Sequence, residues 1–352
     1  MTTETDVIGV GLVGYGMASK VFHAPIIEAV PSLSLKKIVE RRGEESRGRH
    51  AGAETVREFD EVLRDDIELV VVATPNDSHF GLASRALLAG KHVVVEKPFT
   101  NTSAEARELT ELARSQHRLV SAHHNRRWDG DFLTVRKILE GGLLGRLVEY
   151  ESYYDRYRNE PRPGAWRERQ GPGSGVLYDL GPHLIDQALV LFGLPNELTA
   201  DVRTQRDFAK ADDSFDVRLH YDRLSVTLKA TMLAREPGPR FTLHGTEGSF
   251  VKHGLDPQED ALKLGGTPAS EGWGREPEEH WGIINTQAGG VHVRERVETI
   301  AGDYAAYYRN VADAIRGRAE LIVRPEEAAN TIRVIELALE SSASKRTLPF
   351  SP

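Results

Sequence analysis

The first third of the chain alternates short, continuously apolar segments with longer segments of mixed polarity. An apolar run without polar alternation is typical of a strand that is covered on both faces. Strands that alternate with helices in this way predict a doubly wound parallel sheet. The predicted strands are Val7–Val13, Leu35–Val39, Ile67–Ala73, His92–Val95 and Leu119–Ala122, and the predicted helices are Lys20–Ala29, Asn76 to Gly90 (with Asn76 as cap) and Ser103–Ser115 (with Ser103 as cap).

The pattern changes beyond residue 125. Several segments there alternate apolar and polar residues, which predicts an antiparallel sheet with one wetter face. Residues 265–290 are rich in Gly, Pro and Glu and show no period, so they predict a long loop. The other predicted elements are the strands Leu147–Tyr154, Val217–Leu219, Leu224–Met232 and Phe241–His244, and the helices Val176–Leu191, Asp303–Ile315 and Pro325–Ser341.

Length and composition narrow the class of protein. A chain of 352 residues exceeds the usual size of one hydrophobic core, so we expect two domains, 1–125 and 126–352. The net charge of −8 is the opposite of the basic excess of nucleic-acid binders. The absence of cysteine excludes disulfides, thiolate metal sites and cysteine nucleophiles. The first seven residues lack the features of a signal peptide and no apolar run could span a membrane, so we expect a cytoplasmic protein.

A glycine-rich segment lies between the first predicted strand and helix. Gly14 and Gly16 allow the close backbone approach that a dinucleotide pyrophosphate needs, and the start of the following helix offers free N–H groups. We expect Met17 and Ala18, between this turn and the predicted helix, to contact the cofactor as well. Ser19 stands at the third fingerprint position, where Gly or Ala is usual. The alternative is a tight turn that binds no ligand.

The end of the second strand predicts the cofactor preference. A carboxylate at Glu40, 24 residues after Gly16, suits the ribose 2′-hydroxyl of NAD and repels the 2′-phosphate of NADP. Arg41 and Arg42 follow directly, and arginine suits a phosphate. We therefore expect an NAD(P) cofactor, with NAD favoured over NADP; a solvated loop is the alternative for the arginines.

Two further segments follow the ends of buried strands, where doubly wound sheets bind their ligands. Thr74, Pro75, Asn76 and His79 come after Ile67–Ala73, and Glu96-Lys97-Pro98 comes after His92–Val95. We expect the residues of both segments, up to Lys97, to contact the cofactor. A surface lysine at a strand end is the alternative for Lys97.

These motifs, in this order, resemble the Gfo/Idh/MocA oxidoreductases, which are NAD(P)-dependent dehydrogenases of sugars and cyclitols. The resemblance continues through the segments 124–129 (His-Asn-Arg-Arg-Trp-Asp) and 177–187 and extends over nearly the whole chain. The motifs Asn-Arg-Arg-Trp-Asp and Tyr-Asp-Leu-Gly-x-His are most similar to those of the scyllo-inositol dehydrogenase branch. That branch often uses NADP and has a small hydroxyl residue before the arginine, whereas this chain has Glu40-Arg41.

The resemblance implies a fold and a set of catalytic residues. It implies an N-terminal Rossmann domain and a C-terminal α/β domain whose large, mainly antiparallel open sheet packs against a second copy, giving a homo-oligomer (dimer or tetramer). It also implies that Lys97 is catalytic, that the Lys97–Pro98 bond is cis, and that the family's Asp-x-x-x-His pair corresponds to Asp179 and His183.

Those residue types suit the oxidation of an alcohol. His183 can accept the hydroxyl proton because histidine titrates near neutral pH. Asp179 lies four residues earlier, on the same face of the predicted helix, and can orient the imidazole or bind substrate. Lys97 can stabilise the developing alkoxide. No metal is expected, since the nicotinamide accepts the hydride. A helix cap with a polar neighbour is the alternative for Asp179 and His183.

The residues expected around the substrate are polar and aromatic. Hydrogen-bonding groups and an apolar ring face suit a polyol, and a domain or dimer interface would enrich the same residue types. The candidate substrate residues, besides Asp179 and His183, are Asn125, Arg127, Trp128, Tyr153 and Trp166.

The sequence therefore predicts a reversible dehydrogenase that oxidises a secondary ring hydroxyl of a cyclitol or sugar to a ketone or lactone. The alternatives are a non-catalytic NAD(P)-sensing regulator of the same fold and an NAD-dependent glycosidase. Arg126 and Arg127 also leave open a uronate or hydroxy-acid substrate. We expect neither nucleic acid nor membrane as a partner.

Overall fold

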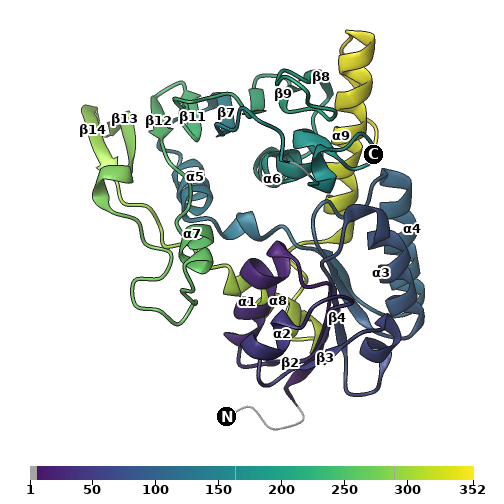
Figure 1. Cartoon of the computed structure of the whole chain (residues 1–352). Helices are drawn as coiled ribbons and strands as arrows, with labels where there is room; N and C mark the ends of the chain where they lie inside the picture. The colour runs from purple at the N-terminus through teal and green to yellow at the C-terminus, as the bar shows by residue number, and fades with distance from the viewer. Residues whose placement is uncertain (1–5, 163, 289) are drawn as a thin grey trace. The chain divides into compact units, whose positions relative to one another are not determined.

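A computed structural model describes residues 6–162, 164–288 and 290–352 (Figure 1). Most of the first seven residues and one residue of the predicted loop 265–290 lie outside the described residues. The chain forms two compact units. Unit 1 comprises the chain up to Trp128 with the segments Gln258–Trp273 and Asp303–Ala329; unit 2 comprises Asp129–Pro257, Gly274–Gly302 and Asn330–Pro352.

The predicted boundary at residue 125 lies near the first crossing between the units, at Trp128, but it assigns two later segments of unit 1 to the second domain. One of these segments carries Tyr304, Tyr307 and Tyr308, each at most 1% exposed in the core of unit 1. Burying three aromatic rings strongly stabilises their position. This burial makes the late segment Asp303–Ala329 part of the N-terminal unit.

Unit 1 is built on a parallel sheet. Within the described residues, six strands pair in the order β3-β2-β1-β4-β5-β6, all parallel. The five predicted strands are confirmed, and β3 is an additional short edge strand in which only Val56 is buried. The strands are β1 (Ile8–Val13), β2 (Leu33–Val39), β3 (Glu54–Val56), β4 (Leu69–Val72), β5 (His92–Val95) and β6 (Val120–Ala122).

Helices cover both faces of this sheet: α3 and α4 lie on one side, and α1 and α8 lie on the other (Figure 1). The predicted helix Lys20–Ala29 begins as a π-helical turn, η2, before α1. The two predicted caps are wrong: Asn76 opens the 3₁₀ turn η4, and Thr102, one residue before Ser103, caps α4 in a capping box with Glu105. The bounds are η2 (Ser19–His23), α1 (Ala24–Glu28), α2 (Glu45–Arg49), η3 (Phe59–Leu63), η4 (Asn76–Ser78), α3 (His79–Leu88), α4 (Ser103–Ser115), η5 (Asn125–Trp128), α7 (Gln258–Lys263) and α8 (Ala305–Ile315).

Unit 2 is built on a large mixed sheet. Nine strands of the described chain pair in the order β14-β13-β12-β11-β7-β10-β9-β8-β15, antiparallel except for β7 with β10. The predicted antiparallel character is therefore confirmed. The strands are β7 (Leu147–Asp155), β8 (Glu197–Arg203), β9 (Ser214–His220), β10 (Ser225–Thr231), β11 (Phe241–Gly245), β12 (Gly248–Lys252), β13 (Gly282–Ala288), β14 (Val291–Val297) and β15 (Leu348–Pro349).

The predicted loop 265–290 is wrong at its end. Gly282–Ala288 is strand β13, which pairs with β12 and β14, and Glu278–His280 is the 3₁₀ turn η7. Strand β14 was not predicted either. None of its residues is buried, although Val291, Val293 and Val297 alternate with polar residues in its sequence. Pairing with the neighbouring strand, rather than burial of its side chains, makes this segment extended.

The long helix α6 packs on β10, β9 and β7 of this sheet. It spans Gly175–Phe192, which confirms the predicted helix Val176–Leu191. The carboxylate of Asp212 accepts a hydrogen bond from the backbone N–H of Leu177 (2.8 Å) at the start of the helix. Gly175 has φ +87°, and a Cβ there would overlap that carboxylate, so only glycine fits. The other helical elements of unit 2 are α5 (Gly130–Glu140), η6 (Trp166–Glu168) and α9 (Pro325–Ser344), whose first turns belong to unit 1.

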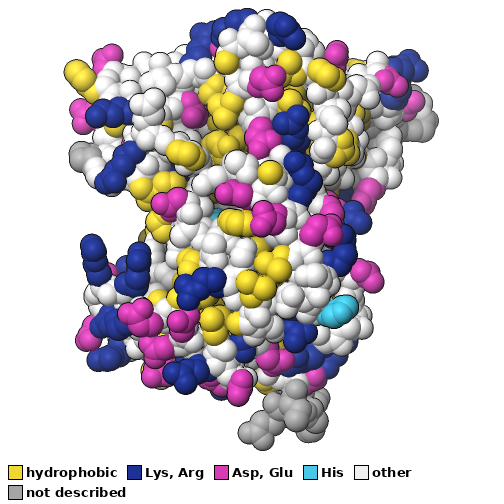
Figure 2. Space-filling model, turned by 90° about the vertical axis from the view of Figure 1, so that its right-hand side faces the viewer, with side chains coloured by type: hydrophobic (Ala, Val, Ile, Leu, Met, Phe, Trp, Pro, Cys, Tyr) yellow, Lys and Arg dark blue, Asp and Glu magenta, His cyan; other side chains and the backbone are white. Residues whose placement is uncertain are grey.

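Basic and acidic side chains are interspersed on the molecular face shown in Figure 2. The acidic excess therefore does not gather into one patch on that face. Among the described residues, none of the helices has the length and apolar character that crossing a bilayer requires.

Candidate active site

The glycine turn of unit 1 follows β1 as predicted. Gly14 has φ +92°, and a Cβ there would lie 2.7 Å from the carbonyl oxygen of Ala73, so this position requires glycine. Ser19, the departure from the fingerprint, is fully buried, and its hydroxyl donates to the carbonyl of Gly14 (2.7 Å). The serine thus fastens the start of the helical run to the turn.

The same turn has the shape that a dinucleotide needs. A Cβ built on Gly16 would meet no atom within 4 Å, so the space beside this residue is open. Met17 is exposed and Ala18 is half-buried at the start of the helical run, where backbone N–H groups have no intrahelical partner. Open space beside unpaired N–H groups fits a pyrophosphate.

Glu40 is engaged by its own loop. Its side chain is buried; Oε1 accepts from the backbone N–H of Glu45 (3.2 Å), and Oε2 accepts from the N–H and hydroxyl of Ser46 (3.0 and 2.7 Å). Burial acts to raise the pKa of Glu40, but these hydrogen bonds outweigh it and hold the pKa below its usual value. Arg41 and Arg42 are exposed, and neither has a hydrogen-bond or ion-pair partner among the described residues.

The segment after β4 is tied to the segment after β5. The hydroxyl of Thr74 lies 2.7 Å from that of Ser78, and Asn76 is buried. The two ring nitrogens of His79 lie 2.9 Å from the carbonyl oxygens of Thr74 and Pro98. The two predicted cofactor segments are therefore joined by one buried imidazole.

The Glu96-Lys97-Pro98 segment contains a cis peptide bond between Lys97 and Pro98, as the resemblance implies. The carboxylate of Glu96 is buried beside two imidazoles: its Oε1 lies 2.9 Å from Nδ1 of His123 and 3.6 Å from Nε2 of His23. Burial acts to raise the pKa of Glu96, but the contacts with His123 and His23 outweigh it and hold the pKa well below its usual value. Lys97 thus follows a buried, ionised carboxylate.

The predicted catalytic pair lies in unit 2, on α6. Asp179 and His183 are one helical turn apart and share a face. His183 is 5% exposed, and Oδ1 of Asp179 lies 3.2 Å from Nε of Arg167, on η6. The Arg167 guanidinium also stacks on the ring of Trp166, 4.5 Å from its centroid. Arg167 is therefore placed beside Asp179, and the predicted substrate residue Trp166 packs against Arg167.

Two arginines expected at the substrate are internal in unit 1. Arg127 donates to Glu327 (2.9 Å) and to the carbonyl of Ile322 (2.9 Å), and Arg126 donates to Glu259. Both arginines are at most 6% exposed. Their charges hold the later segments of unit 1 against the sheet, which removes the basis for expecting an acidic substrate from them.

We expect Glu259→Gln to lower the free energy of unfolding by about 3 kcal/mol at neutral pH. Burial acts to raise the pKa of Glu259, but Arg126 and Lys263 outweigh it and lower the pKa to about 2 from an ordinary value of 4.5. Because the folded-state pKa is depressed, this stabilisation is present above about pH 4.5 and is lost as the pH falls through about 2. Urea unfolding of both proteins at about pH 7 and about pH 3 measures the difference, which should shrink at the lower pH.

The matched control is Asp260→Asn, which changes the exposed neighbouring carboxylate on the same short helix and should alter stability little at either pH. An equal effect of Glu259→Gln at both pH values would contradict the assignment.

The remaining substrate candidates lie in different places. Asn125 is buried and Trp128 is half-buried in η5 of unit 1, where the Trp128 ring meets Tyr307 edge-on. Tyr153 lies on β7 between Ser152 and Tyr154, which are buried toward the core of unit 2, so it occupies the opposite face of the sheet. The structure therefore does not bring Tyr153 together with Asp179 and His183.

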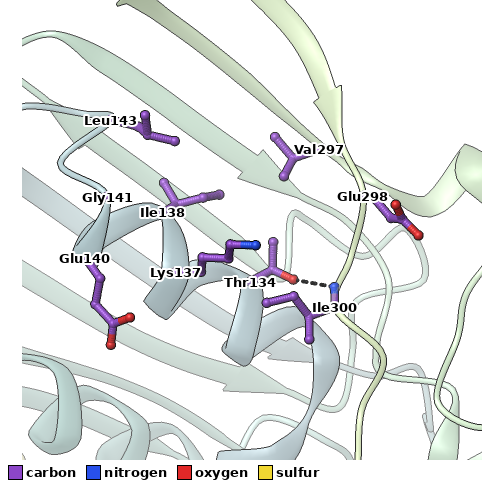
Figure 3. A pocket seen from close by; sticks show the side chains of 9 residues that line it. All are labelled: Thr134, Lys137, Ile138, Glu140, Gly141, Leu143, Val297, Glu298 and Ile300. Atoms are coloured by element: carbon purple, nitrogen blue, oxygen red, sulfur yellow. Dashed lines mark hydrogen bonds between the residues drawn. The ribbon is translucent and has the colours of Figure 1, made fainter.

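A pocket beside α5 is separate from the candidate residues (Figure 3). It lies between that helix and the segment after β14, where the hydroxyl of Thr134 accepts from the backbone N–H of Ile300 (2.9 Å). None of the predicted site residues lines it.

Several contributing residues were missed from the sequence. Arg167 lies in an irregular segment without a periodic signal, and only the folded chain shows its ion pair with Asp179. His23 and His123 meet at Glu96, and Tyr308 hydrogen-bonds to His23, from parts of the chain that are far apart in sequence. The one available signal was His123, a polar residue directly after the apolar strand β6.

Comparisons with known proteins agree with this geometry. Residues 8–124 match the Gfo/Idh/MocA model described as an oxidoreductase family, NAD-binding Rossmann fold, and residues 136–350 match the model of its C-terminal alpha/beta domain. The chain is 42% identical to scyllo-inositol 2-dehydrogenase (NADP(+)) IolW of Bacillus subtilis, covering 98% of this chain and 96% of that protein. It is 45% identical to the oxidoreductase YdgJ of Escherichia coli, covering 98% and 99%.

A solved structure of an oxidoreductase from Bacillus cereus superimposes with a TM-score of 0.91 at 35% identity, covering 98% of this chain and 99% of that one. The family models and the full-length relatives together cover both units. The chain belongs to the Gfo/Idh/MocA family of NAD(P)-dependent oxidoreductases.

Proposed function

We propose that the chain oxidises a secondary ring hydroxyl of a cyclitol or pyranose to a ketone or lactone, reversibly, with scyllo-inositol as the first candidate substrate. The observation that carries the proposal is the pairing of Asp179 and His183 on one face of α6, with His183 buried and Asp179 held by Arg167. The name of the Bacillus subtilis relative supports the choice of an inositol.

In this proposal each residue has a defined task. His183 accepts the proton of the substrate hydroxyl, and Asp179 orients the imidazole and stabilises its protonated form. Lys97 stabilises the negative charge that develops on the alkoxide oxygen. A nicotinamide dinucleotide, when bound, would supply the hydride acceptor. The turn at Gly14 and Gly16 would hold its pyrophosphate, and the segments after β4 and β5 would flank its nicotinamide.

The alternatives differ in what they turn over. A regulatory protein of this fold would bind the dinucleotide without oxidising any polyol, and an NAD-dependent glycosidase would release nitrophenol from a nitrophenyl glycoside. The internal ion pairs of Arg126 and Arg127 weaken the case for an acidic substrate.

A turnover panel tests the proposal. The protein is mixed with NAD or NADP and with scyllo-inositol, myo-inositol, common aldoses, a uronate and a nitrophenyl glycoside, and the absorbance of the reduced nicotinamide is followed. We expect a neutral cyclitol or aldose to reduce the nicotinamide. A dinucleotide that binds to the protein but is reduced by no member of the panel would contradict the proposal.

We further propose that the chain uses NADP in preference to NAD. The sequence favoured NAD because Glu40 was expected to reach the ribose, but its carboxylate already accepts three hydrogen bonds from Glu45 and Ser46. Arg41 and Arg42 are exposed in the same loop. Two exposed guanidinium groups suit a 2′-phosphate, and the Bacillus subtilis relative is named for NADP(+).

We expect the double variant Arg41→Ala, Arg42→Ala to lower kcat/KM for NADP about a hundredfold, through the loss of two charge-assisted contacts. The value for NAD should change less than about threefold. The matched control is Arg47→Ala, an exposed arginine nearby on α2 that pairs with Glu44. A wild-type preference for NAD that the double variant leaves unchanged would overturn this assignment.

Homo-oligomer formation through the open sheet of unit 2 stays a prediction. Tyr153 on the outer face of β7 fits such an interface, where aromatic residues are enriched. Sedimentation velocity of the purified protein measures the oligomeric state directly.

A further inference from the structure

Buried histidines flank the Glu96-Lys97-Pro98 turn of unit 1 on both sides. His79, His123 and His23 are at most 2% exposed and come from the start of α3, the segment after β6 and η2, respectively. Buried polar groups in folded proteins are hydrogen-bonded, so the partners of these imidazoles identify what the imidazoles hold in place.

His79 holds the side of the turn that follows Lys97. Its Nδ1 lies 2.9 Å from the carbonyl oxygen of Pro98, and its Nε2 lies 2.9 Å from the carbonyl oxygen of Thr74. Carbonyl oxygens only accept hydrogen bonds, so the protonated ring nitrogen always donates to one of them. The imidazole therefore lies between the turn after β5 and the end of β4, and it donates to both of them only when both ring nitrogens carry protons.

His123 holds the side of the turn that precedes Lys97. Its Nδ1 donates to Oε1 of Glu96 over 2.9 Å, because an ionised carboxylate only accepts. Nε2 of His23 faces the same oxygen at 3.6 Å, and Nδ1 of His23 lies 2.6 Å from the hydroxyl of Tyr308. With the tyrosine as donor, the proton of His23 sits on Nε2 and points toward the carboxylate, which is the electrostatically favourable tautomer.

Two members of this network have shifted pKa values. Burial lowers the pKa of His123 to about 4, and the pKa of Glu96 lies well below its usual value. At neutral pH an ionised Glu96 carboxylate is therefore hydrogen-bonded to a neutral imidazole of His123.

The side chains of His23, Glu96 and His123 also have the residue types of a metal site. Their ligand atoms all lie within 4.8 Å of one another. The rings of His23 and His123 are tilted against each other, with centroids 4.3 Å apart and planes 39° from parallel. The direct contact between His123 and Glu96 also satisfies both groups without a metal.

We propose that His79 and His123 are positioning residues for Lys97. His79 fixes the backbone after the lysine through Pro98, and His123 fixes the residue before it through Glu96, with His23 and Tyr308 packed behind. The inference rests on the proposed function, in which Lys97 stabilises the alkoxide. A displacement of about 1 Å of such a group costs about a hundredfold in rate.

Variants with an amide side chain distinguish the loss of a hydrogen bond from the loss of side-chain volume. The amide nitrogen of asparagine takes the place of Nδ1 of histidine, and that of glutamine takes the place of Nε2. His79→Asn therefore keeps the contact to Pro98, whereas His79→Gln keeps only the contact to Thr74 and His79→Ala keeps neither. His123→Asn likewise keeps a donor to Glu96, which His123→Leu removes.

We expect His79→Ala and His123→Leu to lower kcat roughly tenfold to a hundredfold and to raise the primary deuterium isotope effect, because hydride transfer becomes slower. The dissociation constant of the dinucleotide, measured by quenching of tryptophan fluorescence, should change less than about threefold in His123→Leu, because His123 lies outside the segments expected to contact the cofactor. Both asparagine variants should recover most of kcat, and His79→Gln should not. His92→Asn is the matched control, since His92 is a half-buried imidazole at the other end of β5 whose Nδ1 accepts from Leu119; its kcat should stay within about threefold of wild type.

Each remaining outcome contradicts the inference. Wild-type kcat in folded His79→Ala and His123→Leu proteins, or equal recovery by His79→Gln and His79→Asn, would overturn it. One equivalent of bound zinc in the purified protein, lost in His123→Leu, would replace it with a metal site. Lys97→Ala is measured alongside: an active Lys97→Ala protein means that the proposed function has failed, whereas an inactive one beside fully active histidine variants means that only this inference has failed.

Discussion

Replacement of Lys97 by alanine is expected to lower kcat/KM for polyol oxidation roughly a thousandfold. Lys97 follows the last residue of β5 and the buried carboxylate of Glu96, in a turn that His79 ties to the end of β4. A cation held in this way costs little reorganisation when negative charge develops on the substrate oxygen. Removing it leaves the alkoxide without that stabilisation, so the loss should appear mainly in kcat.

Steady-state kinetics and dinucleotide binding, measured on the same preparation, test this prediction. Lys37→Ala is the matched control: Lys37 lies on β2 of the same unit and pairs with Asp66 over 3.2 Å at the surface, so its removal should leave kcat within about twofold. Turnover of Lys97→Ala at the wild-type rate would remove Lys97 from the chemistry.

The second large effect is expected at His183. Replacing it by alanine removes the proposed base and should lower kcat roughly a hundredfold to ten-thousandfold. The residue is buried on α6, and its neighbour Asp179 is held by Arg167 over 3.2 Å, so the substitution should leave that ion pair in place. We expect a smaller loss for Asp179→Asn, which keeps the shape of the side chain but removes its charge.

The readout is kcat/KM with the preferred dinucleotide, together with its dissociation constant, which His183→Ala should leave unchanged within about threefold. His244→Ala is the matched control in unit 2, because His244 is a half-buried histidine on β11 that hydrogen-bonds to Ser249. Comparable losses in the two variants would show that His183 has no special role.

Local patterns in the sequence predicted most of the fold. The continuous apolar runs at β1, β4 and β5 are buried along their length apart from His92, and the glycine turn after β1 has the expected conformation at Gly14. Strands β13 and β14 were not predicted. Strand β13 lies at the end of a segment rich in Gly, Pro and Glu, and no residue of β14 is buried, so pairing with β13 makes β14 extended.

Motifs in the sequence place the candidate residue Lys97 just after β5 and the candidates Asp179 and His183 on α6, and their roles stay predictions. Side chains whose partners lie far along the chain were not predictable. Arg127 pairs with Glu327 and Arg126 pairs with Glu259, so the arginines expected at the substrate stabilise unit 1 instead. Glu40 was expected at a ribose, but its partners Glu45 and Ser46 depend on the conformation of the loop.

Transfer of deuterium from substrate to cofactor tests the central claim most directly. The protein is incubated with oxidised NADP or NAD and with scyllo-inositol, myo-inositol or glucose deuterated at the ring carbons, and the reduced dinucleotide is analysed by mass spectrometry. The account predicts that at least one of these polyols transfers one deuterium to the nicotinamide, and that Lys97→Ala and His183→Ala nearly abolish the transfer. Bound dinucleotide that gains no deuterium from any polyol, or transfer that both variants retain, would contradict it.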